Sequence, residues 1–297
     1  MHENIKSKLQ GVNAINITPF GDDGAVDFPA LGRNLDHLIA QGIEAIYPCG
    51  NTGEYYSLTC EEAKDVAEFA IRHVAGRAAV IVGIGHDANT AAQLALHAAR
   101  CGADGLMLHQ PAHPFQSERG MLAYYREVAA ATALPLVLYV RHGSVTAGML
   151  KEAAAIPQVI AVKYAVNHLP SFAKAVHLIG DDLVWICGTA ESWAPFFFAA
   201  GAVGFTSGMV NVDAGRSLAM LQALREGRYK DAMRIWEEVR PFEELREQNG
   251  SGNNVSVVKN AMAQLGLGSS AVRPPSAPLT QADHERVAAV LRSWGLL

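Results

Sequence analysis

The chain has 297 residues, of which 50% are hydrophobic and 18% are charged, and its formal net charge at pH 7 is −5. This length and composition allow one large α/β domain, or two smaller ones, with a full core. Charges of both signs are interspersed, which argues against nucleic acids or anionic membranes as the main partner. No apolar run approaches the about 20 residues of a membrane-spanning helix. Four scattered cysteines and a start without a signal-peptide pattern predict a cytoplasmic protein.

Short apolar runs, spaced about 25 to 35 residues apart, predict β-strands along most of the chain. The runs are Val12–Ile17, Ala45–Pro48, Ala79–Gly83, Gly105–Leu108, Leu136–Val140, Val159–Lys163, Leu183–Cys187 and Ala202–Thr206. The segments between them have apolar residues at helical spacing, as in Phe28–Gln41, Cys60–Val74 and Thr90–Cys101. Thr59 lies three residues before Glu62, a capping box that predicts the start of one of these helices.

Eight strand–helix units in a chain of this length predict a (β/α)8 TIM barrel. The same alternation is also compatible with an open doubly wound sheet. From about Leu224 the rhythm changes to helices alone, expected at Tyr229–Leu245, Asn254–Leu265 and Gln281–Trp294. We therefore expect a barrel domain with the active site over residues 1–224 and a C-terminal helical subdomain packed on it over residues 225–297.

Lys163 lies in an apolar, β-branched segment, Val159–Val166, that has the composition of a strand buried on both faces. Burial disfavours a charged ammonium, so a lysine held there loses its proton more easily and becomes a nucleophile for ketones. The segment is equally compatible with two unreactive roles for this lysine. The amine could reach water beyond the strand end, or it could pair with a carboxylate.

Other polar residues follow the predicted strands, where the function of a barrel is normally found. Asn51 and Thr52 lie in a glycine-flanked turn that could hold a carboxylate or could be an ordinary turn. Tyr139 could relay protons or fill the barrel, and Arg141 could grip a distal carboxylate or lie at the surface. Gly188 and Thr206 follow or end the seventh and eighth strands.

Two further segments argue against a nucleotide and a metal ion. Gly83–Ala88 superficially resembles a dinucleotide fingerprint, but the acidic residue expected about 20 residues later is not in place. His109 and His113 have a metal-like spacing only on a helix, which Pro111 and Pro114 forbid. We predict neither a cofactor nor a metal.

Taken together, these residues resemble the dihydrodipicolinate synthase/N-acetylneuraminate lyase family over nearly the whole chain. The resemblance depends on Ile17–Phe20, Gly50–Glu54 followed by Leu58-Thr59, Tyr139, Lys163 and Val257–Lys259. It implies that Lys163 forms an imine with a 2-oxo acid, that Tyr139 shuttles protons, and that Asn51 and Thr52 hold the substrate carboxylate. It also implies a homo-oligomer, a dimer or a tetramer.

The chain departs from the lysine-pathway synthases of that family in two places. His113 stands where a proton-relay tyrosine from a neighbouring subunit is expected, and we include it among the substrate-binding candidates. Ser144 stands where those synthases have an arginine for the second substrate, and serine cannot replace that clamp. Arg141, Gly188–Glu191 and Val272–Pro275 instead look like the family's keto-deoxy sugar-acid dehydratases.

The sequence therefore predicts a Schiff-base lyase that acts on pyruvate or a keto-deoxy sugar acid, by aldol chemistry or by dehydration. A 4-hydroxy-tetrahydrodipicolinate synthase, which joins pyruvate and aspartate semialdehyde, is one alternative. A relative that binds 2-oxo acids without turnover is another, and the two departures motivate it.

Overall fold

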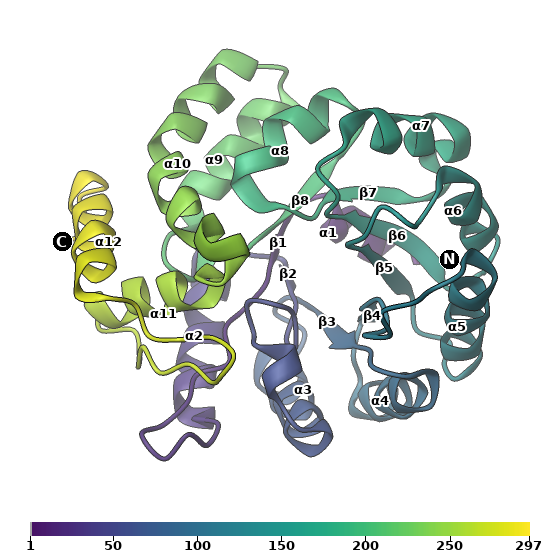
Figure 1. Ribbon diagram of the computed structural model, residues 1–297, viewed down its shortest axis with the longest axis horizontal. Coiled ribbons are helices and arrows are strands. Elements are labelled where there is room, and N and C mark those ends of the chain that lie inside the picture. The colour runs from purple at the N-terminus through teal and green to yellow at the C-terminus, as the bar shows by residue number, and fades with distance from the viewer. Residues whose placement is uncertain (1) are drawn as a thin grey trace.

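The computed structural model describes residues 2–297, and its centre is a closed barrel of eight parallel strands (Figure 1). Each strand pairs with the next one along the chain, and β8 pairs with β1 to close the barrel. This closure excludes the open sheet. The strands are β1 (Val12–Ala14), β2 (Ala45–Ile46), β3 (Ala79–Ile84), β4 (Gly105–Leu108), β5 (Leu136–Val140), β6 (Val159–Tyr164), β7 (Val184–Cys187) and β8 (Gly204–Ser207).

A ring of helices surrounds the strands and buries its apolar face against them (Figure 1). The ring consists of α2 (Phe28–Ala40), α3 (Cys60–Val74), α4 (Ala88–Cys101), α5 (Glu118–Ala130), α6 (Ala147–Ala154), α7 (Leu169–Ile179), α8 (Ala190–Ala199) and α9 (Ala214–Arg225). The predicted capping box is present at α3, where Thr59 and Glu62 bond to each other's backbone N–H groups. Gly102 ends α4 with a φ of 90°, a conformation that glycine adopts without strain.

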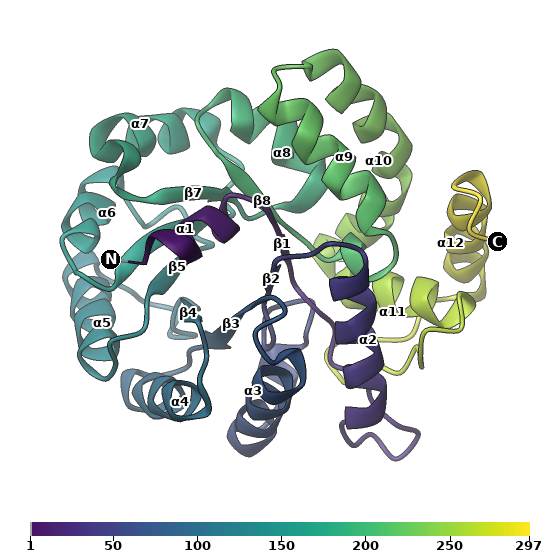
Figure 2. The ribbon, with the colours of Figure 1, turned by 180° about the vertical axis from the view of Figure 1, so that it is seen from behind.

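A short helix that we did not predict, α1 (Glu3–Leu9), lies across the N-terminal end of the barrel (Figure 2). Leu9 is fully buried there and belongs to the core inside the barrel. The rest of that core includes Tyr47, Met107, Val137 and Ile186. α1 and these side chains occupy the N-terminal part of the barrel, and the cavity of Lys163 lies at the opposite end of the strands.

The first strand is shorter than predicted, because a side chain takes over its pairing. β1 ends at Ala14, whereas the apolar run continues to Ile17. Beyond Ala14 the chain keeps one bond to β8, from the Ile15 N–H to the Ser207 carbonyl over 2.8 Å, and the amide of Asn211 then takes the place of the neighbouring strand. It donates from Nδ2 to the Ile15 carbonyl over 2.9 Å and accepts from the Ile17 N–H over 3.2 Å. Residues 15–17 are therefore buried and hydrogen-bonded without belonging to the sheet.

Three helices follow the barrel, close to the ranges expected: α10 (Tyr229–Ser251), α11 (Asn254–Gln264) and α12 (Gln281–Ser293). In Figure 1, α12 is the outermost of them, and the junction between α10 and α11 lies toward the viewer, at the C-terminal ends of the strands. Gln248–Gly250 are non-helical, which breaks α10 near its end. The division into two domains stays a prediction. Within residues 2–297, no helix combines the length and the apolar character needed to cross a membrane.

Candidate active site

Lys163 lies near the end of β6 with its side chain inside the barrel, and only 3% of the residue is exposed. Among the residues that the structure describes, no carboxylate forms a salt bridge with it. The structure thus supports neither of the two unreactive roles, an amine that reaches water or an amine that is paired with a carboxylate. Burial, reinforced by the positive charge of Arg141, lowers the pKa of Lys163 to about 7. A substantial fraction of the amine is therefore neutral at physiological pH.

Tyr139 is the neighbour of Lys163 on β5, and the two residues are directly paired in the sheet. The Lys163 Nζ atom lies 4.1 Å from the centre of the Tyr139 ring. The tyrosine hydroxyl accepts a hydrogen bond from Asn51 Nδ2 over 3.1 Å, which fixes its position. Burial raises the pKa of Tyr139 to about 12, so the hydroxyl keeps its proton at neutral pH. The pair thus combines a potential nucleophile with a proton donor.

The turn after β2 carries Asn51 and Thr52 to the same end of the barrel. Thr52 is buried, and the backbone N–H groups of Asn51 and Thr52 donate to no other backbone group between residues 2 and 297. These N–H groups and the Thr52 hydroxyl are therefore available to an anion. Glu54, in the same turn, accepts a hydrogen bond from the backbone N–H of Arg273 over 2.9 Å. It also forms a buried ion pair with Lys259 of α11, which ties the turn to the C-terminal helices.

A cavity of about 480 Å³ joins these groups at the C-terminal ends of the strands. All the predicted site residues except His113 line it: Asn51, Thr52, Tyr139, Arg141, Lys163, Gly188 and Thr206. Thr206 is buried and its hydroxyl donates to the Cys187 carbonyl over 3.4 Å. At Gly188 a Cβ atom would lie 2.9 Å from the Tyr164 carbonyl oxygen, so a larger residue would disturb this wall.

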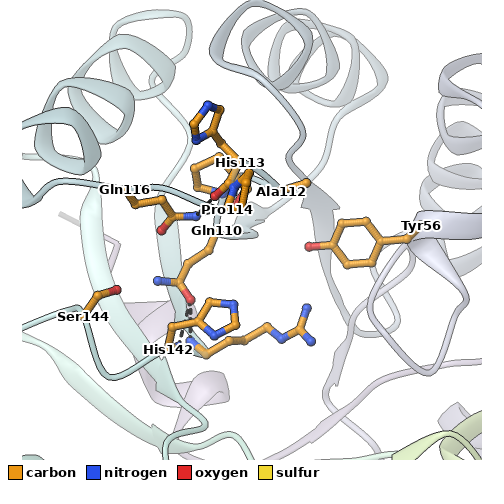
Figure 3. Close-up of a pocket in the computed structure, with 10 residues that line it drawn as sticks. Tyr56, Gln110, Ala112, His113, Pro114, Gln116, His142 and Ser144 are labelled. Carbon is orange, nitrogen blue, oxygen red and sulfur yellow. Dashed lines mark hydrogen bonds between the residues drawn. The ribbon is translucent and has the colours of Figure 1, made fainter.

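Arg141 also lines a second cavity, of about 500 Å³, beside the first. Figure 3 shows Tyr56 on one side of it, with His113, Gln116 and Ser144 on the others. Gln110 holds the loop after β5, because its Oε1 accepts from the N–H groups of Arg141 and His142 over 2.7 and 3.1 Å. The exposed Arg141 side chain is therefore the one charged group shared by both cavities among the described residues.

The two histidines with metal-like spacing lie in different environments. His109 is fully buried, stacked on Tyr55 with ring centres 4.4 Å apart, and its Nε2 lies 3.0 Å from the Cys49 carbonyl. Burial lowers the pKa of His109 to about 3, so the ring is neutral. His113 is exposed and its Nδ1 bonds within its own loop, to Phe115. Within this chain it does not reach the cavity of Lys163.

The prediction from sequence missed the contribution of the C-terminal helices. Glu243, Arg246 and Asn254 line the Lys163 cavity, and the first two are buried. Arg246 Nη1 donates to both Glu243 carboxylate oxygens, over 2.6 and 2.8 Å, and its Nη2 donates to Asn254 Oδ1. The Asn249-Gly250 pair, a turn signal between the predicted helices Tyr229–Leu245 and Asn254–Leu265, was the available sign that the chain bends here.

Glu191 is a second buried carboxyl group close to this wall. Its side chain accepts a hydrogen bond from Ser217 Oγ over 2.5 Å and has no access to solvent. Burial, with the nearby charge of Glu243, raises the pKa of Glu191 to about 7. The carboxyl group lies behind the cavity wall, since only the preceding Gly188–Ala190 segment lines the cavity.

Known proteins of one family are similar to this chain over nearly its whole length. The model of the family described as "Dihydrodipicolinate synthetase family" matches residues 8–293. A 4-hydroxy-tetrahydrodipicolinate synthase of Pelobacter propionicus is 33% identical over 288 residues, which are 95% of this chain and 97% of the relative. The crystal structure of dihydrodipicolinate synthase from Oceanobacillus iheyensis is 40% identical, covers 100% of both chains and superposes with a TM-score of 0.97. That from Bacillus clausii is also 40% identical, covers 98% of this chain and 99% of the other, and has a TM-score of 0.95.

Proposed function

The chain belongs to the dihydrodipicolinate synthetase family, a family of lyase-type enzymes, and on this premise we propose that it is a Schiff-base-forming lyase of 2-oxo acids. The observation that carries the proposal is the buried amine of Lys163, which has a pKa lowered to about 7, faces a cavity and lies beside the Tyr139 ring. A lysine with these properties is suited to attack a ketone.

The reaction begins when the neutral amine attacks C2 of the oxo acid. Tyr139 moves one proton from the nitrogen to the former carbonyl oxygen, which gives a carbinolamine. A further proton on that oxygen releases it as water and leaves a protonated imine. The Thr52 hydroxyl and the N–H groups of Asn51 and Thr52 hold the substrate carboxylate during these steps.

The imine then acts as an electron sink for the bond next to it. In a dehydration, a proton leaves C3, and the electrons left behind expel the C4 hydroxyl, which departs with a proton as water. One water molecule then hydrolyses the new imine, which frees Lys163 and an unsaturated 2-oxo acid. In an aldol cleavage, the C4 hydroxyl loses its proton and the C3–C4 bond breaks instead of the C3–H bond, which releases an aldehyde and leaves an enamine. A proton added at C3 and one water molecule then free Lys163 and the shorter 2-oxo acid.

A keto-deoxy sugar acid is the substrate class that we propose, for dehydration or aldol cleavage. Arg141 at the edge of the cavity is suited to a distal carboxylate or hydroxyl group, and the second cavity beside it gives room for a longer substrate than pyruvate. Ser144 lines only that second cavity and is exposed. It offers no fork of donors for the carboxylate of aspartate semialdehyde.

The test is reductive trapping with pyruvate and borohydride. We expect one pyruvate-derived adduct, located by peptide mass spectrometry on Lys163. The Lys163→Ala variant should retain its circular dichroism spectrum and lose both the adduct and all turnover. An adduct on a different lysine, or none at all, would overturn the proposal.

A second candidate is the synthase reaction, because curated relatives of similar length are named 4-hydroxy-tetrahydrodipicolinate synthase. Two assays separate the candidates: condensation of pyruvate with aspartate semialdehyde, and product release from a panel of keto-deoxy sugar acids. We expect turnover in the second assay only. Adduct formation without turnover in either assay would instead favour a protein that binds 2-oxo acids without converting them.

Assembly into a homo-oligomer also stays a prediction.

A further inference from the structure

Gly208, directly after β8, brings two polar side chains from distant parts of the chain together. A Cβ atom built on Gly208 would lie 2.6 Å from Arg246 Nη2 and 2.9 Å from Thr52 Oγ1. The two atoms are therefore at most 5.5 Å apart, the sum of these distances. Thr52 comes from the turn after β2, and Arg246 comes from the end of α10. Both residues line the cavity of Lys163.

This separation suits one carboxylate. A charge-assisted hydrogen bond to a carboxylate oxygen is about 2.8 Å long, so even a single oxygen can bridge two donors that are about 5.6 Å apart. The two oxygens of a carboxylate can accept from both donors without stretching either bond. The missing side chain of Gly208 leaves the space open, since any Cβ atom there would collide with both donors.

The remaining contacts of Arg246 hold its guanidinium group in place without using all of its donors. Nη1 faces Glu243, Nε faces the Asn254 carbonyl at 3.4 Å, and Nη2 uses one of its two N–H groups for Asn254 Oδ1. The second N–H of Nη2 has no acceptor among residues 2–297. A buried arginine with an unused donor beside a cavity is suited to an anionic ligand.

We propose that Arg246 and Thr52 form a carboxylate cradle across Gly208 that binds the C1 carboxylate of the 2-oxo acid. This inference rests on the proposed function and assigns to the C-terminal helices a direct contact with substrate. Glu243, which also lines the cavity, accepts from Nη1 of the guanidinium group, where it orients Arg246 and partly neutralises its charge. Arg246 is a substrate-binding residue in this assignment, because it touches the carboxylate and not the reacting carbonyl.

The experiment measures the concentration of ketone that gives half-maximal trapping at Lys163, for pyruvate and for acetone, which has the ketone but no carboxylate. In Arg246→Gln we expect the value for pyruvate to rise about 10- to 100-fold, the loss of one charged hydrogen bond. The value for acetone should stay within about twofold of the wild type, because acetone has no group for the cradle. Arg246→Lys should lie between the two proteins, since it keeps the charge and loses the fork.

The Glu243→Gln variant removes the negative charge beside Arg246 and should have the opposite effect on the trapping of pyruvate. Without the carboxylate charge, Arg246 attracts an anion more strongly, so pyruvate should reach half-maximal trapping at a lower concentration than in the wild type. If Arg246 had only a structural role, both variants would weaken the trapping of pyruvate and acetone alike, and that result would overturn the assignment. An unchanged pyruvate value in Arg246→Gln would overturn it as well. Failure of the wild type to form any adduct would overturn the imine proposal itself.

Discussion

At the scale of single residues, the reactivity of Lys163 depends on its charged and apolar surroundings. Burial is the largest cause of its lowered pKa, and Arg141 adds to it. Cys187 opposes the shift, and burial raises the pKa of that thiol itself to about 12. Arg141 therefore has two effects that can be separated: it can contact substrate, and it favours the neutral amine.

The dependence of imine formation on pH should show the effect of Arg141 on the pKa of Lys163. Only the neutral amine attacks a ketone, so trapping of acetone should increase with pH and reach half its maximal rate near pH 7. Removing the positive charge in Arg141→Gln makes protonation of Lys163 easier, which raises its pKa and shifts the midpoint to a higher pH. Cyanoborohydride trapping followed by intact-protein mass spectrometry measures both curves.

The matched control for this experiment is Arg234→Gln, which removes an exposed arginine from α10. Its midpoint should equal that of the wild type, because a distant exposed charge is screened. A midpoint that does not move in Arg141→Gln would contradict the assigned influence of Arg141 on the amine.

At the scale of elements, the sequence predicted helices and strands more reliably than the contacts between their ends. The tail helices begin where their patterns indicate, at Tyr229, Asn254 and Gln281. The role of Asn211 in ending β1 could not be predicted, because a side chain that replaces a strand leaves no periodic signal. The approach of α10 to Gly208 was missed as well. It depends on how the chain folds back over the barrel and not on local pattern.

Lys259 illustrates how α11 supports the site from a distance. It is fully buried, pairs with Glu54 beside the Asn51-Thr52 turn, and donates to the Ala271 carbonyl over 2.9 Å. Removing the cation in Lys259→Met leaves the Glu54 carboxylate buried without its partner. We expect a loss of about 3–5 kcal/mol in the free energy of unfolding, measured by urea denaturation.

Two further variants test the cause of that loss. Lys151→Met removes an exposed lysine from α6 and should change the free energy of unfolding by less than about 0.5 kcal/mol. The double variant Glu54→Gln/Lys259→Met removes both charges and should recover part of the stability. A double variant that is less stable than Lys259→Met would show that the unpaired carboxylate is not the origin of the effect.

At the scale of the whole molecule, the strand–helix pattern predicted the closed barrel, which the structure confirms, but the pattern by itself did not exclude an open sheet. Both architectures alternate strands with helices, and closure depends on the pairing of β8 with β1, between residues almost 200 positions apart. Lys163 could be recognised because a charged lysine is not expected in a β-branched strand that is buried on both faces. Arg246 could not, because an arginine in a charged helix is ordinary and only its position in the folded chain distinguishes it.

The buried amine should also affect the stability of the whole molecule. The pKa of Lys163 is about 7 in the folded chain, against an ordinary value of 10.5. Between these pH values this residue binds more protons in the unfolded chain than in the folded one, so the contribution of Lys163 to the free energy of unfolding rises with pH across this range. Lys163→Met removes the titration. Below about pH 7 the free energy of unfolding of this variant should exceed that of the wild type by several kcal/mol, at about 1.4 kcal/mol for each pKa unit. This difference should shrink steadily toward pH 10.5.

Urea denaturation of both proteins at several pH values measures the difference, with Lys151→Met as the comparison that should show no such slope. A difference independent of pH would mean that Lys163 titrates normally in the folded protein, and its activation would then need another cause.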